Sequence, residues 1–255
     1  MLPILQIGPL AIPFPTVILL LAIWIGMGQA EKLAPRYQMN ANRLLNLVML
    51  GLAAGVIGAR LAFAARFPGA FLDDPVSLLA PRAVMLDLPG GLLIGALAAL
   101  IYGQRLKVPL WPTLDALTPT MAIFAIGFAL SQLASGDGYG ASTRLPWGIA
   151  LWGAVRHPTQ IYAVIAAILI TVLVWPRQGK GEQSFFWRAG NTFLSFVALS
   201  AFARILLEPF RGDSVLLAGG LRQAQLAGWL ILAASLWLIG KRMQTRVHEK
   251  PAIME

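Results

Sequence analysis

The sequence lacks cysteine altogether and is poor in charged residues. Its 255 residues include no cysteine, and only 12% are Asp, Glu, Lys or Arg, against about 25% in an ordinary soluble domain. Without cysteine the chain has no disulfide, no thiolate zinc site and no cysteine nucleophile. So little charge cannot cover the surface of a soluble protein of this size. Because 58% of the residues are hydrophobic, against about 45–50% on average, we predict an integral membrane protein.

The chain instead contains seven long apolar segments. A membrane-spanning helix needs about 20 mostly apolar residues, and these segments are rich in Leu and Ala without two-residue alternation, which favours helices over the strands of a barrel. The predicted spans are residues 14–30, 44–65, 89–103, 112–135, 159–175, 191–210 and 225–240. We therefore predict an all-α integral membrane protein in which residues 1–255 form a single polytopic domain.

The distribution of Lys and Arg predicts how these spans are oriented. Twelve of the 20 basic residues fall in alternate loops and after the last span, whereas the first 15 residues carry no charge. The twelve are Lys32, Arg36, Arg43, Arg105, Lys107, Arg177, Lys180, Arg188, Lys241, Arg242, Arg246 and Lys250. Because cytoplasmic loops are enriched in Lys and Arg, we predict an outer N-terminus and a cytoplasmic C-terminus. The net charge of +9 therefore reflects topology, and no nucleic-acid partner is expected.

Three charged residues fall at helical spacing in the sixth predicted span. Arg204, Glu208 and Arg211 are offset by four and seven positions, which predicts one shared helix face. A charge at membrane depth costs about 2.5–3.5 kcal/mol, so this face should turn into the bundle or an aqueous cavity. Two interpretations stay open: an ion-pair ladder that holds helices together, and an anion site in which an arginine binds phosphate and Glu208 orients it. Pro209 predicts that the helix bends or ends there.

A second polar group opens the fifth predicted span. In Arg156-His157-Pro158-Thr159-Gln160, the Pro-Thr pair is typical of a helix start, where free backbone N–H groups favour anions. His157 and Gln160 are three positions apart, so we expect them to share a helix face. His157 is interpreted either as a structural residue or as a catalytic one.

Other polar and glycine positions are also candidates for a ligand site. We expect Gln132 to line the outer end of the fourth span, with helix packing by small residues as the alternative interpretation of this region. Arg60 lies near the outer end of the second span, where snorkelling is the alternative. Gly90 and Gly91 follow Pro89 at the start of the third span. The missing side chains would let another backbone or a lipid head group come close.

Taken in order along the chain, these fragments resemble the bacterial prolipoprotein diacylglyceryl transferase family. The resemblance covers nearly the whole chain. The matching fragments are Gly58-Ala-Arg-Leu61, Gly90-Gly-Leu-Leu-Ile-Gly95, Leu114-Asp115, Tyr139-Gly140, Leu145-Pro-Trp-Gly148, Arg156-His-Pro-Thr-Gln-Ile-Tyr162 and Arg204-Ile-Leu-Leu-Glu-Pro-Phe-Arg211. Gly220-Leu-Arg-Gln-Ala-Gln225 also resembles the family's approach to its last helix. The family implies seven spans with the N-terminus outside. It also implies transfer of a diacylglyceryl group from phosphatidylglycerol to the cysteine thiol of a lipoprotein precursor, on the outer side of the inner membrane.

Carried over residue by residue, the resemblance implies a set of site residues. Arg204 would lie in the reaction centre near the phosphate, with Glu208 and His157 as the other catalytic candidates. Glu208 and Arg211 would hold the surrounding ion-pair network. The candidate lipid- and phosphate-binding residues are Arg60, Gln132, Arg156, Arg211, Gly90 and Gly91. We expect no cofactor and no metal.

The chain departs from the family's pattern at several of its motifs. Where the family shows His-Gly-Gly before the third span, this chain has Pro89. Where the fourth span of the family reads Gly-Arg-Ile-Gly-Asn, Ala129 and Gln132 take the places of the Arg and the Asn. A Tyr of the first span aligns near Pro15, and the Glu after the fifth-span motif is Ala163. Because Ala cannot bind phosphate and Pro cannot transfer a proton, the resemblance predicts a divergent or catalytically altered member.

Three hypotheses about function follow. The first is an active diacylglyceryl transferase, or a related lipid transferase, that uses Arg204. The second is a family member that has lost the chemistry and binds lipid or serves as a structural subunit of a larger membrane complex. Both predict a lipid-sized cavity near Arg204. A transporter or channel comes third, because no paired broken-helix repeats support it. The expected partners are a phosphatidylglycerol-like phospholipid, the membrane, and a prolipoprotein or membrane-complex subunits, in the bacterial inner membrane.

Overall fold

The computed structural model describes residues 4–7, 10–74, 76, 86–176 and 188–244. The chain divides into two compact units, one of residues 30–113 and the other of residues 1–29 with 114–255. It passes from one unit to the other near the ends of two helices, α1 (Phe14–Leu33) and α5 (Leu110–Ser135). The expectation of a single domain over residues 1–255 stays a prediction.

Among the described residues, five helices are long and apolar enough to cross a membrane. They are Phe14–Tyr37, Ala41–Arg66, Leu110–Ser135, Asn191–Phe210 and Gln223–Gln244. The shorter apolar helix α6 (Thr159–Val174) and the 18-residue α4 (Leu88–Arg105) coincide with the two remaining predicted segments. The all-α membrane fold is thus confirmed, whereas seven crossings and their orientation stay predictions. Four of the basic residues that predicted the orientation lie outside the described residues: Arg177, Lys180, Arg246 and Lys250.

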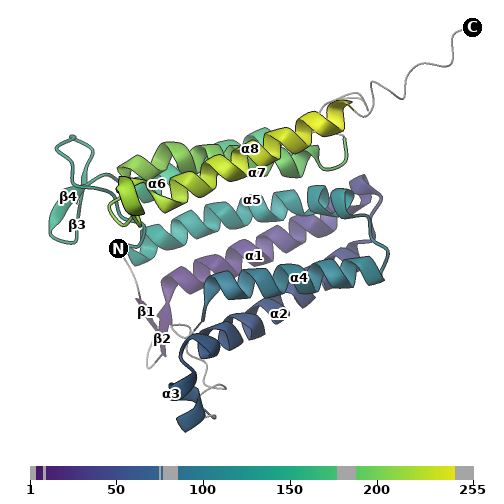
Figure 1. Cartoon of the computed structure of the whole chain (residues 1–255), viewed down its shortest axis with the longest axis horizontal. Coiled ribbons are helices and arrows are strands. Elements are labelled where there is room, and N and C mark those ends of the chain that lie inside the picture. Colours follow the sequence, from purple (N-terminus) through teal and green to yellow (C-terminus); the bar gives the residue numbers. More distant parts are fainter. Residues whose placement is uncertain (1–3, 8–9, 75, 77–85, 177–187, 245–255) are drawn as a thin grey trace, which may run out of the picture. The chain divides into compact units, whose positions relative to one another are not determined.

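Within the described residues, strands form two short antiparallel hairpins. β1 (Ile4–Ile7) pairs with β2 (Leu10–Pro13), and β3 (Ile149–Leu151) pairs with β4 (Ala154–Arg156). A bridge from Ser142 to the end of β4 extends the second hairpin toward the segment that leaves α5. Each predicted span coincides with a helix, and the second hairpin, which follows α5 and precedes α6 in the chain, lies beyond the ends of these helices (Figure 1).

In the unit of residues 30–113, α2 (Ala41–Arg66) and α4 pack along each other (Figure 1). Glycines permit this close approach. A Cβ on Gly95 would lie 2.6 Å from the carbonyl oxygen of Gly51, and a Cβ on Gly91 would lie 2.8 Å from that of Gly55. Larger side chains would push the helices apart, so small residues set their spacing.

Asp87 joins the start of α4 to the end of α2, beyond the short helix α3 (Pro68–Asp73). Its Oδ1 accepts a hydrogen bond from the Gly90 N–H at 2.7 Å and caps α4. Its Oδ2 lies 2.8 Å from Arg66 Nη1, and its own N–H donates to the carbonyl of Ala59 at 3.0 Å. Asp87 is buried, so these contacts fix the first turn of α4 against α2.

The other unit contains most of α1 and α5, together with α6 and two further helices, α7 and α8, and α7 packs against both α6 and α8. Its elements include α7 (Asn191–Leu207), η5 (Glu208–Phe210), η6 (Ala218–Gly220) and α8 (Gln223–Gln244), whereas η1 (Ala34–Tyr37) belongs to the unit of residues 30–113. A Cβ on Gly228 of α8 would lie 2.9 Å from Ile205 of α7. Thr120 Oγ1 of α5 donates to the carbonyl of Gly26 in α1 at 2.8 Å. α6 lies beside α5, where Thr171 Oγ1 donates to the carbonyl of Ala122, and the candidate site lies between these two helices and α7.

Candidate functional site

A partly open cavity lies between α5, α6 and α7, and its empty space, counted together with the solvent at its mouth, is about 740 Å³. Its lining is mostly apolar and includes six alanines: Ala125, Ala129, Ala163, Ala166, Ala167 and Ala203. Polar side chains also line it, among them Gln132, Thr159, Arg204 and Arg211. An apolar cavity with a few polar groups is the usual form of a small-molecule site, and a cavity near Arg204 is what both lipid hypotheses require.

Arg204 stands in the last turn of α7 and forms an ion pair with Glu208. Its Nη2 lies 2.9 Å from Glu208 Oε2, and the pair is spaced i,i+4 as predicted. The Arg204 side chain is 42% exposed, whereas that of Glu208 is 1% exposed. Within the described part of the chain, the Glu208 carboxylate oxygens have no hydrogen-bond partner. The ion pair with Arg204 is therefore the contact that balances the buried charge of Glu208.

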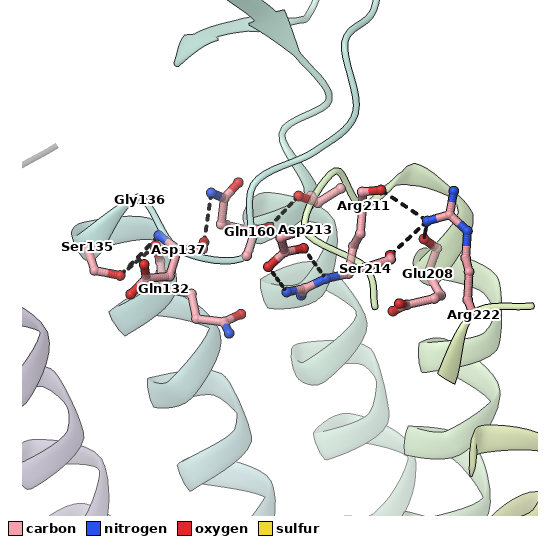
Figure 2. Close-up of polar contacts among 12 residues, drawn as sticks. Gln132, Ser135, Gly136, Asp137, Gln160, Glu208, Arg211, Asp213, Ser214 and Arg222 are labelled. Atoms are coloured by element: carbon pink, nitrogen blue, oxygen red, sulfur yellow. Dashed lines mark hydrogen bonds and ion pairs between the residues drawn. The ribbon is translucent and has the colours of Figure 1, made fainter. Parts of the chain in front are cut away.

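Arg211 does not share the helix face of Arg204, so that expectation is wrong. The α-helix ends at Leu207, and the 3-10 turn that follows contains Pro209. Proline has no N–H for an i−4 hydrogen bond, which explains this end. Arg211 is extended, with a ψ of 140°. Its Nε donates to Asp213 Oδ1 at 2.9 Å and its Nη2 to Oδ2 at 2.6 Å, a bidentate pair (Figure 2).

The two arginines still line the same cavity, and each already has a carboxylate partner. The Arg204 pair is formed along a helix, and the Arg211 pair is formed across a turn. This arrangement combines elements of both interpretations: the charges compensate one another, and both guanidinium groups border a cavity. Guanidinium groups with spare N–H donors can bind a further anion.

The Arg211 guanidinium lies next to Gln132 of α5, across the loop that follows this helix. Gly138 of that loop has a φ of +65°, and a Cβ there would lie 2.9 Å from Gln132 Oε1 and 3.2 Å from Arg211 Nη1. A glycine is therefore needed for both the backbone conformation and the space. Gln132 lines the cavity as expected; a role in binding lipid stays a prediction.

The loop of residues 136–140 is held by side chains that follow it in the chain. Its carbonyl groups accept hydrogen bonds from Trp152 Nε1, Gln160 Nε2, Thr159 Oγ1 and Arg156 Nη1. The Gln160 contact to the Asp137 carbonyl is 3.0 Å long and is drawn in Figure 2. Thr159 and Gln160 are buried at the first turn of α6. This loop is thereby fixed over one end of α5, beside Gln132.

His157 and Arg156 lie before α6 rather than on it, because the helix begins at Thr159. The shared helix face expected for His157 and Gln160 is therefore wrong. The His157 ring packs edge-on against Phe210, with 5.2 Å between ring centroids. Within the described residues its buried Nδ1 has no hydrogen-bond partner. The Arg156 guanidinium lies 4.9 Å from the centroid of the Tyr139 ring.

The remaining candidates, Arg60, Gly90 and Gly91, belong to the unit of residues 30–113. The Arg60 guanidinium lies 5.6 Å from the centroid of the Phe71 ring. A Cβ on Gly90 would collide with Ala62, and a Cβ on Gly91 would lie 2.7 Å from that of Ala59. Both glycines therefore have a packing role against α2. Their contact with lipid, and that of Arg60, stay predictions.

Two residues of the site were not singled out from the sequence. Asp213 is the bidentate partner of Arg211, and its position two residues away was an available signal. Arg222 donates from one nitrogen to the carbonyls of Glu208 and Arg211 and to Ser214 Oγ. No sequence pattern predicts that contact, because it depends on how the loop between α7 and α8 folds back.

The fold and the site together define a multi-pass α-helical membrane protein with an apolar cavity bordered by ion-paired arginines. A family model described as prolipoprotein diacylglyceryl transferase matches residues 3–240. The chain therefore belongs to the prolipoprotein diacylglyceryl transferase family.

Individual relatives agree with this assignment. The chain is 32% identical over 237 residues to the phosphatidylglycerol–prolipoprotein diacylglyceryl transferase of Thermus thermophilus, covering 81% of this chain and 82% of the relative. It is 31% identical over 212 residues to the protein of the same name in Geobacter sulfurreducens, covering 80% and 78%. The match to the Synechococcus elongatus protein of that name is 24% identical and covers 98% and 91%. The similarity thus extends over most of each chain.

Proposed function

We propose that this chain binds phosphatidylglycerol in the cavity between α5, α6 and α7 and acts as a divergent prolipoprotein diacylglyceryl transferase. The observation that carries the proposal is the placement of Arg204 and Arg211 on one apolar cavity. The family membership supports the reaction type. The guanidinium groups would hold the phosphate, and the alanine-rich lining would hold apolar parts of the lipid.

The reaction needs a phosphate site and a route for one proton. The thiol sulfur of the prolipoprotein would form a bond to the glycerol carbon of the diacylglyceryl group as the bond from that carbon to the phosphate oxygen breaks. The thiol proton leaves, and glycerol phosphate departs as the anion. Arg204 and Arg211 would stabilise the negative charge on that leaving group, since fixed donors aimed at developing charge contribute strongly to catalysis. Glu208 would orient Arg204.

His157 is the proposed acceptor of the thiol proton. Imidazole is the most common general base in enzymes, and the ring of His157 contacts Phe210, the residue before Arg211. Within the described residues, the buried Nδ1 has no partner that would hold its proton elsewhere. Arg156 would act through the loop of residues 136–140, whose Gly140 carbonyl it binds.

Complementation tests this function. The chain would be expressed in a bacterium depleted of its own diacylglyceryl transferase, with Arg204→Gln as the matched variant. We expect lipidated lipoprotein and growth with the unchanged chain and neither with the variant. Absence of lipidation in both, with the chain present in the membrane, would overturn the transferase proposal.

A second candidate is a non-catalytic lipid-binding subunit of a membrane complex. It is supported by Ala129 and Ala163, which both line the cavity, if the resemblance is right that they stand where the family has an arginine and a glutamate. Binding of phosphatidylglycerol by the purified chain without transfer to a prolipoprotein peptide, together with co-purifying membrane proteins, would support this candidate over the first.

We place the chain in the bacterial inner membrane, with the cavity's arginines toward the outer side. The orientation of its basic residues supports this placement. The proposed partners are phosphatidylglycerol and a prolipoprotein. Reporter fusions to the two ends of the chain test this orientation. A reporter that is active only in the cytoplasm should be active when fused to the C-terminus and inactive when fused to the N-terminus.

A further inference from the structure

Arg222 connects Glu208, the ion-pair partner of Arg204, to Arg211. Its Nη1 lies 2.8 Å from the carbonyl oxygen of Glu208, 3.1 Å from that of Arg211 and 2.7 Å from Ser214 Oγ (Figure 2). The two carbonyls stand at opposite ends of the turn of residues 208–211. One side chain therefore spans the turn that separates the partner of Arg204 from Arg211 itself.

The loop between α7 and α8 delivers Arg222 to this turn by folding back on itself. The Leu217 N–H donates to the carbonyl of Leu221 at 2.7 Å, and the Gln223 N–H donates to that of Val215 at 3.0 Å. A further bridge pairs Leu216 with Arg222. Arg222 thus lies at the base of a closed loop, and its position is fixed before any ligand arrives.

The contacts of Arg222 do not neutralise its positive charge. All three acceptors are neutral oxygens, and no carboxylate of the described residues forms an ion pair with it within 4.0 Å. In the cluster around the turn, Arg204 pairs with Glu208 and Arg211 pairs with Asp213. Arg222 therefore adds one net positive charge to a cluster that is otherwise balanced.

We propose that Arg222 is a positioning residue, which holds the turn of residues 208–211 so that the Arg204 and Arg211 guanidinium groups bind one phosphate together. This inference rests on the proposed function for the identity of the ligand. Arg222 does not line the cavity, so it acts through the two arginines rather than by touching the lipid. Loss of its hydrogen bonds would release the turn and misalign the pair, at a cost in affinity for the phosphate.

The test uses the full chain in detergent, titrated with dioleoyl phosphatidylglycerol and, for comparison, dioleoyl phosphatidylcholine. Arg222→Gln should bind phosphatidylglycerol about tenfold more weakly, the loss expected for one charge-assisted hydrogen bond. Arg222→Lys keeps the charge, but its Nζ stands one bond nearer the backbone than Arg222 Nη1 and should not reach all three acceptors, so its affinity should fall in between. The matched control is Arg144→Gln, which removes an exposed arginine outside the site and should bind as the unchanged chain does.

A second measurement does not depend on lipid. The Arg211 N–H donates to the Glu208 carbonyl, and the Gly212 N–H donates to the Tyr139 carbonyl. Hydrogen exchange of the peptide that contains both amides should be faster in Arg222→Gln than in the unchanged chain and in Arg144→Gln. This measurement tests whether Arg222 holds the turn of residues 208–211, and it does so independently of lipid binding. If the unchanged chain shows no preference for phosphatidylglycerol, the proposed function is overturned, but the exchange result still tests the role of Arg222.

Unchanged exchange at these amides in a folded Arg222→Gln protein would overturn the inference. So would unchanged affinity for phosphatidylglycerol when the unchanged chain prefers this lipid. If Arg222→Gln does not fold, Arg222→Lys decides the matter: wild-type affinity and exchange in Arg222→Lys would show that the spanning geometry is not required.

Discussion

Asp115 of α5 and Phe193 of α7 are joined by a hydrogen bond across 78 residues of sequence: the Phe193 N–H donates to Asp115 Oδ1 at 2.9 Å. The other oxygen of this carboxylate accepts from the Gly190 N–H. One buried side chain of α5 thus satisfies two of the free N–H groups around the start of α7. Because α7 carries Arg204 and lines the cavity, this contact helps to position that wall of the cavity against α5.

Asp115→Ala should destabilise the protein by about 1–3 kcal/mol, because it leaves buried backbone N–H groups without acceptors. Asp115→Asn keeps one side-chain oxygen and should lose less. Thermal unfolding in detergent measures both. An alanine variant as stable as the unchanged chain would contradict the capping role.

Arg204→Gln should also destabilise the protein, because it leaves the Glu208 carboxylate buried without its ion-pair partner. The expected loss is about 1–3 kcal/mol, less than for a fully buried pair because Arg204 is partly exposed to solvent screening. The double variant Arg204→Gln/Glu208→Gln removes the unpaired charge and should recover part of the stability. Chemical unfolding compares the two, and a double variant less stable than the single one would argue against this account.

Gly138→Ala should weaken lipid binding as well as stability. The new Cβ must adopt a positive φ, at a cost of about 1–2 kcal/mol, and it would crowd Gln132 and Arg211. Gly153→Ala is the matched control: its φ is +75°, but nothing lies within 4 Å of the added Cβ. We expect similar stability losses from the two variants and reduced affinity for phosphatidylglycerol only in Gly138→Ala. Equal affinities would contradict the placement of Gly138 at the lipid site.

Ala166→Leu should reduce the lipid capacity of the cavity with little effect on folding. Ala166 lines the cavity, and a leucine side chain would occupy part of its empty space. Ala227→Leu, on an exposed position of α8, adds the same groups outside the cavity. Mass spectrometry of lipid retained after purification measures the difference. Retention should fall in Ala166→Leu alone, and the same retention in both would show that lipid does not occupy this space.

The helices could be predicted from the sequence because their signals are local. Runs of apolar residues, the Pro-Thr start of α6 and the Pro209 stop of α7 each act within a few residues. The i,i+4 pair of Arg204 and Glu208 was predicted for the same reason. The prediction that Arg211 shares this helix face fails, because it assumes helical spacing beyond Pro209, whereas α7 ends at Leu207.

Contacts between distant segments could not be predicted. The cap that Asp115 provides and the hold of Arg222 on the turn of residues 208–211 depend on which elements meet in space. The error over His157 has a local cause instead: α6 begins at Thr159, two residues later than a shared face with Gln160 would need. The family resemblance supplied candidate residues, but not the partners that hold them.

In each of the two ion pairs the partners are close in sequence, and this has a consequence for insertion into the membrane. Arg204 finds Glu208 one helical turn away, and Arg211 finds Asp213 two residues away. Each pair can form as soon as its own segment folds, without waiting for a neighbouring helix. Charged side chains that enter a bilayer unpaired are costly, and here the segment can leave the insertion machinery with its charges already neutralised in pairs. The guanidinium groups of Arg204 and Arg211 would thus enter the membrane without needing a partner protein or a lipid to neutralise them.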